Sequence, residues 1–107
     1  MTGIYAMQRA NGDWFVEERD GRLNVPVFPT THFALMSRFR NLGMLLFKPV
    51  FLNSDLLQQL ISKADGKPID FCLIDDPFGS LFRGKRLGRQ QLESLMKGDA
   101  EMKVESA

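Results

Sequence analysis

The sequence has one cysteine, one histidine and no long apolar run, and each scarcity excludes a class of protein. Cys72 alone can form neither an intramolecular disulfide nor a multi-cysteine zinc site, and it fits a reducing compartment. The longest apolar run, Met44–Phe47, is strand-sized, whereas a membrane helix needs roughly 18 apolar residues. No basic segment followed by an apolar one opens the chain, so we expect no signal peptide. These features predict a soluble, cytoplasmic protein without a membrane contact.

An excess of charge of one sign is also absent. Fourteen Lys and Arg residues stand against 13 Asp and Glu residues, which gives a formal net charge of +1. This balance provides no general attraction to nucleic acid or to an anionic membrane. The chain of 107 residues, 44% hydrophobic, has the size and composition of one globular domain. We expect a single domain over residues 1–98 and a flexible polar tail over residues 99–107.

Turn signals divide the first third of the chain into three predicted strands. Asn11-Gly12 and Asp20-Gly21 are typical of two-residue hairpin turns. Their spacing predicts an antiparallel meander with strands over residues 4–10, 13–19 and 22–28. Pro26 in the third strand favours an edge position, or at least a backbone nitrogen that faces no partner strand.

A strand-to-helix transition follows at Phe28-Pro29. Thr30 and Thr31 are both good N-cap residues, and Gly43 is a typical stop signal, so we predict a helix from about residue 31 to residue 42. The apolar stripe of this amphipathic helix consists of Leu35, Met36, Phe39 and Leu42.

The second half of the chain alternates predicted strands and helices. Residues 44–51 start with apolar residues on both faces, which predicts a central strand. Asn53 or Ser54 caps a second helix, whose stripe is Leu56, Leu57, Leu60, Ile61 and Ala64. A strand over residues 69–75, a short strand over 81–83 ended by Gly84, and a helix over 90–97 follow. The order βββαβα(ββ)α predicts an α+β or mixed α/β two-layer domain with a mixed β-sheet and two to three helices.

The reactive side chains lack the partners that catalysis requires. His32 is the only histidine, and a general base needs an oriented partner. Cys72 lies in an apolar strand, and nothing local in the sequence provides the cation or helix N-terminus that a reactive thiol needs. Asp75-Asp76 precedes Pro77 and is typical of a turn opening. We therefore expect no enzymatic activity, no catalytic residue, no metal site and no cofactor. A hydrolase using His32 with Asp75 or Asp76 is the least favoured hypothesis.

The segment from residue 77 to residue 89 is the predicted functional surface, because loops held on a rigid scaffold often carry binding residues. It combines two loop aromatics with four cations, and the predicted partner-binding residues are Phe78, Phe82, Arg83, Lys85, Arg86 and Arg89. If the aromatics make the contact, the partner is a protein or a second copy of the chain. If the cations of residues 83–89 make it, the ligand is an anion or a nucleic acid.

Several short motifs resemble a known family. The segment 23–29, Leu-Asn-Val-Pro-Val-Phe-Pro, is followed by a helix carrying Ala34. Leu56-Leu-Gln-Gln-Leu60, the stretch 69–79 and Gln91-Leu-Glu-Ser-Leu95 continue the likeness. The order is similar to the N-terminal domain of the SseB family, and also to a family of short bacterial proteins of unknown function with a "G-x-x-x-x-P-V-W" strand. Asp76 stands where the SseB pattern prefers Asn. The resemblance covers residues 22–96 and implies a small bacterial domain without an established catalytic residue.

The leading hypothesis is therefore a small soluble binding or adaptor module that acts through protein–protein contacts. The alternative is anion or nucleic-acid binding through the basic loop 83–89.

Overall fold

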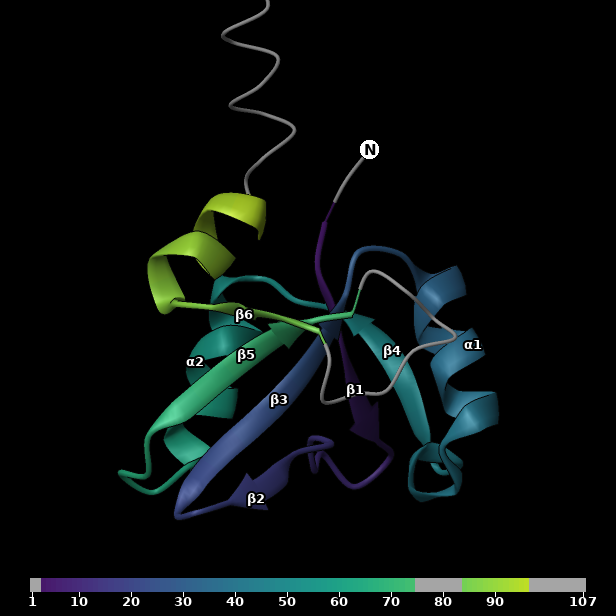
Figure 1. Ribbon diagram of the computed structural model, residues 1–107, viewed down its shortest axis with the longest axis horizontal. Coiled ribbons are helices and arrows are strands. Elements are labelled where there is room, and N and C mark those ends of the chain that lie inside the picture. Colours follow the sequence, from purple (N-terminus) through teal and green to yellow (C-terminus); the bar gives the residue numbers. More distant parts are fainter. Residues whose placement is uncertain (1–2, 75–83, 97–107) are drawn as a thin grey trace, which may run out of the picture.

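One mixed β-sheet with helices packed on it forms the fold (Figure 1). The structure is a computed structural model that describes residues 3–74 and 84–96. The strands are β1 (Tyr5–Arg9), β2 (Glu17–Arg19), β3 (Arg22–Phe28), β4 (Phe47–Phe51), β5 (Ile69–Leu73) and β6 (Lys85–Leu87). The helices are α1 (Thr31–Arg40), the 3-10 helix η1 (Leu42–Met44) and α2 (Ser54–Lys63), and residues 89–96 are helical as well. This order confirms the predicted α+β class with a mixed sheet.

The sheet has the strand order β4-β1-β3-β5-β6, and β2 pairs with β3 on the side where β1 lies. The pairing of β3 with β5 is parallel, and the other pairs are antiparallel. The N-terminal strands are thus antiparallel as predicted, but β1 and β2 both pair with β3. The residues before β2 meet β1 at the bridge between Gln8 and Trp14 and through backbone hydrogen bonds that flank this bridge. The parallel pair requires the crossover that the predicted order implied.

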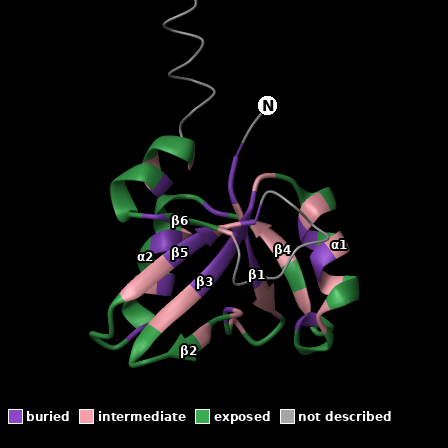
Figure 2. Cartoon of the chain, viewed as in Figure 1, coloured by how far each residue is buried: buried purple, intermediate pink, exposed green. Residues whose placement is uncertain are grey.

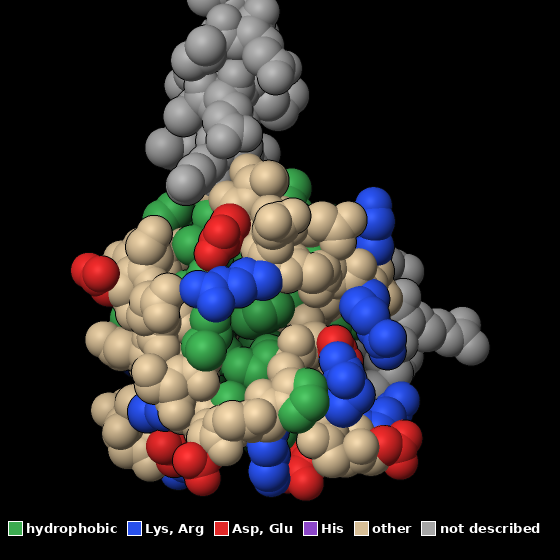
Figure 3. Space-filling view, turned by 90° about the vertical axis from the view of Figure 1, so that its left-hand side faces the viewer, with side chains coloured by type: hydrophobic (Ala, Val, Ile, Leu, Met, Phe, Trp, Pro, Cys, Tyr) green, Lys and Arg blue, Asp and Glu red, His purple; other side chains and the backbone are tan. Residues whose placement is uncertain are grey.

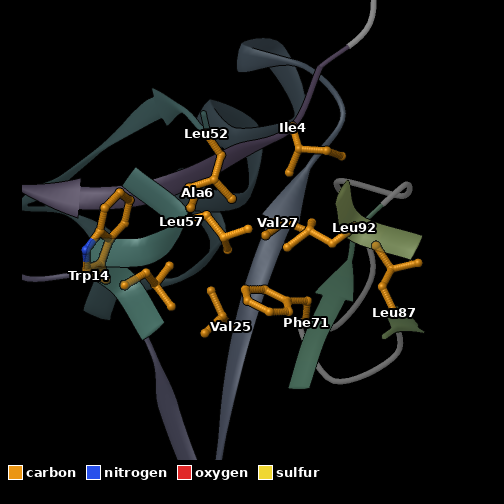
Figure 4. Close-up of a cluster of buried hydrophobic side chains, with 11 residues drawn as sticks. Ile4, Ala6, Trp14, Val25, Val27, Leu52, Leu57, Phe71, Leu87 and Leu92 are labelled. Carbon is orange, nitrogen blue, oxygen red and sulfur yellow. The ribbon is translucent and has the colours of Figure 1, made fainter. Parts of the chain in front are cut away.

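Two apolar clusters occupy the two faces of the sheet, because successive strand residues point to opposite sides. One cluster joins the sheet to α2 and the helix at 89–96, and its side chains are drawn in Figure 4: Ile4, Ala6, Trp14, Val25, Val27, Leu52, Leu57, Leu60, Phe71, Leu87 and Leu92. The other lies under α1 and contains Met7, Phe28, Ala34, Met44, Cys72 and Ile74. Helices therefore cover both faces of the sheet, rather than one face as a two-layer domain would have.

Pro26 lies in a central strand, so the expected edge position is wrong. Leu23 donates its N–H to Pro68 beside β5, and alternation along the strand then turns the nitrogen of Pro26 to the opposite side. On that side, β3 pairs with β2 through residues 22–24 and with β1 through residues 27–28. Pro26 falls between these two pairings, where its missing N–H leaves no partner unsatisfied.

The region between α1 and β4 departs most from the prediction. α1 ends at Arg40 with Asn41 as its C-cap, and Gly43 lies inside η1 instead of stopping the helix. The predicted strand over residues 44–51 is limited to β4, which is an edge strand and not a central one. An apolar run therefore does not suffice to place a strand in the middle of a sheet.

The later elements agree better with the sequence. Asn53 caps α2, and its side chain accepts a hydrogen bond from the N–H of Leu56 at 2.8 Å. Leu57, Leu60 and Ala64 are buried as the stripe predicts. The described strand β6 begins directly after Gly84. The predicted strand over 81–83 and the predicted tail over 99–107 lie outside the described residues.

Candidate functional site

Helix α1 turns small residues to the sheet and large apolar residues to solvent. Its buried residues are Ala34 and Ser37, whose exposed fractions are 0% and 1%. Leu35 is 37% exposed and Phe39 is 75% exposed. The predicted apolar stripe, apart from the partly buried Met36, therefore faces away from the core.

The exposed apolar residues continue into the turn between α1 and β4. Leu42, Leu45 and Leu46 are 77%, 52% and 71% exposed, and Figure 2 shows exposed residues along α1 and in this turn. We refer to Leu35, Phe39, Leu42, Leu45 and Leu46 as the α1 apolar surface. Single exposed leucines are ordinary, whereas a concentration of large apolar side chains in one short segment marks an interaction site.

The charged residues next to the α1 apolar surface in the sequence are all basic. Arg38, Arg40 and Lys48 flank it, and the sequence contains no Asp or Glu from Gly21 to Ser54. Arg38 donates a hydrogen bond to the backbone carbonyl of Phe47 at 3.2 Å. The surface therefore combines apolar contact area with a cationic surrounding.

The neighbouring edge of the sheet is protected against a further strand. Leu52 donates its N–H to Ile4, and the antiparallel register then turns the backbone groups of Phe47, Pro49 and Phe51 to the free edge. Pro49 has no N–H to offer there, and Arg38 already occupies the carbonyl of Phe47. These are devices that discourage edge-to-edge pairing. A partner is therefore expected to contact side chains rather than extend the sheet at β4.

Three of the six predicted partner-binding residues lie in the described part of the chain. Phe78, Phe82 and Arg83 lie outside the described residues. Lys85 and Arg86 are neighbours on β6, so their side chains point to opposite faces of the sheet. Arg89 begins the following helix and pairs with Glu93 at 3.2 Å. The described cations of the basic segment are therefore distributed over two faces of the sheet and a helix.

Arg86 instead joins two arginines from the first half of the chain. A polar pocket of about 180 Å³ is lined by Arg19, Arg22, Arg86, Asn24, Asp70 and Cys72, with Asp20 and Gly84 beside them. We refer to it as the arginine pocket. Figure 3 views the molecule from the side of β5 and β6 and shows Lys and Arg side chains gathered along one edge of this view, with acidic side chains among them.

Strand register explains why these residues meet. Arg19 lies directly opposite Arg22 in the β2–β3 pair, Asn24 pairs with Asp70 between β3 and β5, and Cys72 pairs with Arg86 between β5 and β6. Like charges directly opposite each other destabilise an antiparallel pair. The three arginines and two aspartates of the pocket give it a formal charge of +1. The excess of positive charge favours an anionic ligand.

Of the two aspartates of the pocket, Asp70 is held in its charged form. Arg22 donates two hydrogen bonds of 2.8 Å to Asp70, and these bonds lower the pKa of Asp70 despite its partial burial. Within the described residues, the guanidinium of Arg86 makes no hydrogen bond or salt bridge of its own. No described residue therefore uses its N–H donors, although its charge acts on Asp70 and Cys72.

Among the residues that the structure describes, the other candidate side chains do not come together as a catalytic group. His32 is exposed in the first turn of α1, and its nearest ring contact is the neighbouring Phe33. Cys72 is buried, and burial raises the pKa of its thiol. Asp75 and Asp76 lie outside the described residues. Over residues 3–74 and 84–96, no three His, Cys, Asp or Glu side chains come together as a metal site. In the same part of the chain, no helix is long and apolar enough to span a membrane.

Comparisons with protein-family models, curated proteins and solved structures found no match. The resemblance to the SseB family therefore stays a prediction. The function is inferred below from the α1 apolar surface and the arginine pocket.

The sequence alone predicted neither the α1 apolar surface nor the arginine pocket. The apolar stripe of α1 was visible, and its small residues Ala34 and Ser37 gave a signal that the opposite side of the helix packs on the sheet. The arginine pocket had no local signal, because Arg19 and Arg86 are brought together only by the pairing of β2, β3, β5 and β6.

Proposed function

We propose that this chain is a small cytoplasmic binding or adaptor module without catalytic activity, which acts through a protein–protein contact at the α1 apolar surface. The observation that carries the proposal is the outward position of Phe39, Leu42 and Leu46, each more than two-thirds exposed. Burial of apolar surface is the main favourable term in most protein–protein association. Large apolar side chains that stabilise a core are buried in it. These three side chains are exposed, so their apolar surface is available to a partner.

The charges favour a partner with acidic residues around an apolar centre. The cations of Arg38 and Lys48 would meet acidic groups at the rim of the interface, where complementary charge steers association. A symmetric pair of two copies would place the two cationic rims against each other. A heterologous partner therefore fits the surface better than a second copy.

The test compares three forms of the protein as bait in its native extract. A Phe39→Ser, Leu42→Ser double variant removes the centre of the surface, and Leu95→Ser changes an exposed leucine of the helix at 89–96 as a matched control. We expect a protein retained by the wild type and the control and lost with the double variant. The purified pair must then reproduce the loss and bind more weakly as salt rises.

Two results would overturn the proposal. In one, light scattering of the purified wild type shows a dimer that the double variant dissociates, which makes the partner a second copy. In the other, every retained protein binds the double variant as well as the wild type. Because the three forms differ only at exposed positions, circular dichroism serves as the check that each is folded.

The second candidate function is anion binding, supported by the position of Arg86 beside Arg19 and Arg22 in the arginine pocket. Guanidinium groups bind phosphate and carboxylate through paired hydrogen bonds. Titration with inorganic phosphate, followed by backbone amide NMR at constant ionic strength, tests it. Arg86→Gln should weaken binding roughly tenfold, whereas Lys85→Gln, on the opposite face of β6, should change it less than about twofold.

Asp70→Asn should have the opposite effect on phosphate affinity in the same titration. Removing this carboxylate removes a negative charge from the pocket and releases the two hydrogen-bond donors of Arg22. Phosphate should therefore bind more tightly to this variant than to the wild type. Equal effects of Lys85→Gln and Arg86→Gln would instead indicate general attraction by surface charge, and no saturable shift would exclude the site.

A further inference from the structure

A second pocket lies between the C-terminal end of α2 and the end of the sheet where β1, β3 and β4 meet. Its volume is about 280 Å³, which is close to the lower limit of about 300–1,000 Å³ for small-molecule sites. Its apolar lining consists of Trp14, Val16, Leu23, Phe47, Leu60 and Ala64. We refer to it as the Trp14 pocket. It shares no residue with the arginine pocket or the α1 apolar surface.

The indole of Trp14 carries an unsatisfied donor at the wall of this pocket. The side chain is 7% exposed, and its Nε1 is buried without a hydrogen-bond partner in the described part of the chain. Figure 4 shows the ring at one end of the apolar cluster, with its nitrogen turned away from the other labelled side chains. Buried tryptophan nitrogens usually find an acceptor. An acceptor supplied from outside the chain would satisfy this N–H.

Charged residues at the pocket indicate which acceptor fits. The guanidinium of Arg9 lies over the ring of Phe47, 5.7 Å from its centre. Lys63 donates to the carbonyl of Gly12 at 2.7 Å, and its Nζ is 3.9 Å from the Asp13 carboxylate. Two cations against one acid give the lining a formal charge of +1. An ammonium has three donors and a guanidinium five, so both cations retain donors for an anionic group.

We propose that the Trp14 pocket binds a small apolar carboxylate. The carboxylate accepts a hydrogen bond from Trp14 Nε1 and pairs with Lys63 and Arg9, while the apolar body packs against Leu60 and the other apolar lining residues. The proposal is independent of the protein partner at the α1 apolar surface, because the two sites have no residue in common. It also explains why a tryptophan occupies a position where phenylalanine would leave no donor unpaired.

The sole tryptophan of the chain makes the test direct. Octanoate, kept below its critical micelle concentration, is titrated into the wild-type protein, with octanol as the uncharged analogue. Two signals follow the binding: the fluorescence of Trp14 and its single indole N–H resonance in a ¹⁵N–¹H spectrum. We expect a saturable change in both signals, with the indole proton moving downfield as it gains an acceptor, and weaker binding of octanol.

Substitutions at the rim separate a specific site from general apolar binding. Lys63→Gln and Arg9→Gln should each weaken octanoate binding by roughly three- to tenfold and leave octanol unchanged. Lys67→Gln is the matched control, because Lys67 pairs with Glu18 outside the pocket. All three positions are accessible to solvent on at least part of the side chain, so folding should persist.

Three results would overturn the proposal. Equal binding of octanoate and octanol would show an apolar cavity without selectivity for a carboxylate. An indole resonance that does not respond while fluorescence changes would place the ligand elsewhere. No saturable response in either signal would indicate that a bound water only satisfies Trp14.

Discussion

Arg22 and Asp70 are 48 residues apart in the sequence and form a two-pronged ion pair, with both N···O distances 2.8 Å. The pair joins the start of β3 to β5 on the face that carries the arginine pocket. It sits next to the parallel register of Leu23 with Ile69, so it stabilises the side-by-side placement of the two central strands. It also fixes one of the three guanidinium groups of the pocket.

The Arg22–Asp70 pair should make stability depend on pH in the acidic range. Hydrogen bonding by Arg22 lowers the pKa of Asp70 below its unfolded value of about 3.9. A carboxyl whose folded pKa is lowered contributes stability above the unfolded pKa and loses it as the pH falls through the folded pKa. Asp70→Asn should therefore lower the free energy of unfolding at neutral pH, and the difference from wild type should disappear in strong acid. Urea denaturation across this pH range measures it.

The effect should be modest, because the Arg22 side chain is 51% exposed and solvent screens its charge. A double-mutant cycle provides the control. In an Arg22→Gln background, Asp70→Asn should show a much smaller pH-dependent difference. A difference of unchanged size would mean that another group lowers the pKa of Asp70.

Because α1 packs on the sheet through small residues, we expect stability to be more sensitive to a change at its buried alanine than at its exposed phenylalanine. Ala34→Leu places a larger side chain between α1 and the sheet and should cost about 1–3 kcal/mol of stability. Phe39→Ser removes a large aromatic from a position that is 75% exposed, and it should change stability by no more than about 0.5 kcal/mol. Chemical denaturation of the two variants compares them. A larger loss for Phe39→Ser than for Ala34→Leu would show that the helix is turned the other way.

Local signals in the sequence were sufficient for turns and helix starts. Asp20 and Gly21 both have positive φ, 54° and 77°, as a two-residue hairpin of this composition requires. Thr30 caps α1 through a 3.0 Å hydrogen bond from the N–H of Phe33. These features depend on backbone sterics and short-range hydrogen bonds, which neighbouring residues determine.

Placement across the sheet could not be obtained in the same way. The apolar run before β4 suggested a central strand, yet Leu45 and Leu46 are exposed in the turn that precedes an edge strand. α1 meets the sheet through the side that carries Ala34 and Ser37, because these small side chains let the helix approach the sheet closely. The arginine pocket depends on a parallel β3–β5 pairing with long sequence separation. Periodicity reports that a face is apolar, but not what covers it.

Gly84 should be intolerant of any side chain. A Cβ at this position would lie 2.6 Å from both the Cys72 sulfur and the Leu73 carbonyl oxygen. Since the carbonyl belongs to the backbone of β5, it cannot move aside without disturbing the β5–β6 pairing. We expect Gly84→Ala to cost about 1–3 kcal/mol, as other overpacked positions do. Gly88→Ala is the control, because its nearest contact is 3.7 Å away, and equal losses in both variants would contradict the steric argument.

The thiol of Cys72 should react slowly in the folded protein. The residue is 5% exposed, and burial raises its pKa, while a hydrogen bond from Gly84 and the charge of Arg86 act in the opposite direction. Because the thiolate is the reactive form, labelling by iodoacetamide at mildly alkaline pH should be slower in the native state than in urea. Arg86→Gln removes the positive charge that favours the thiolate, so it should slow native labelling further and leave the rate in urea unchanged. Faster native labelling of Arg86→Gln, with folding intact by circular dichroism, would mean that Arg86 shields the thiol by covering it and not through its charge.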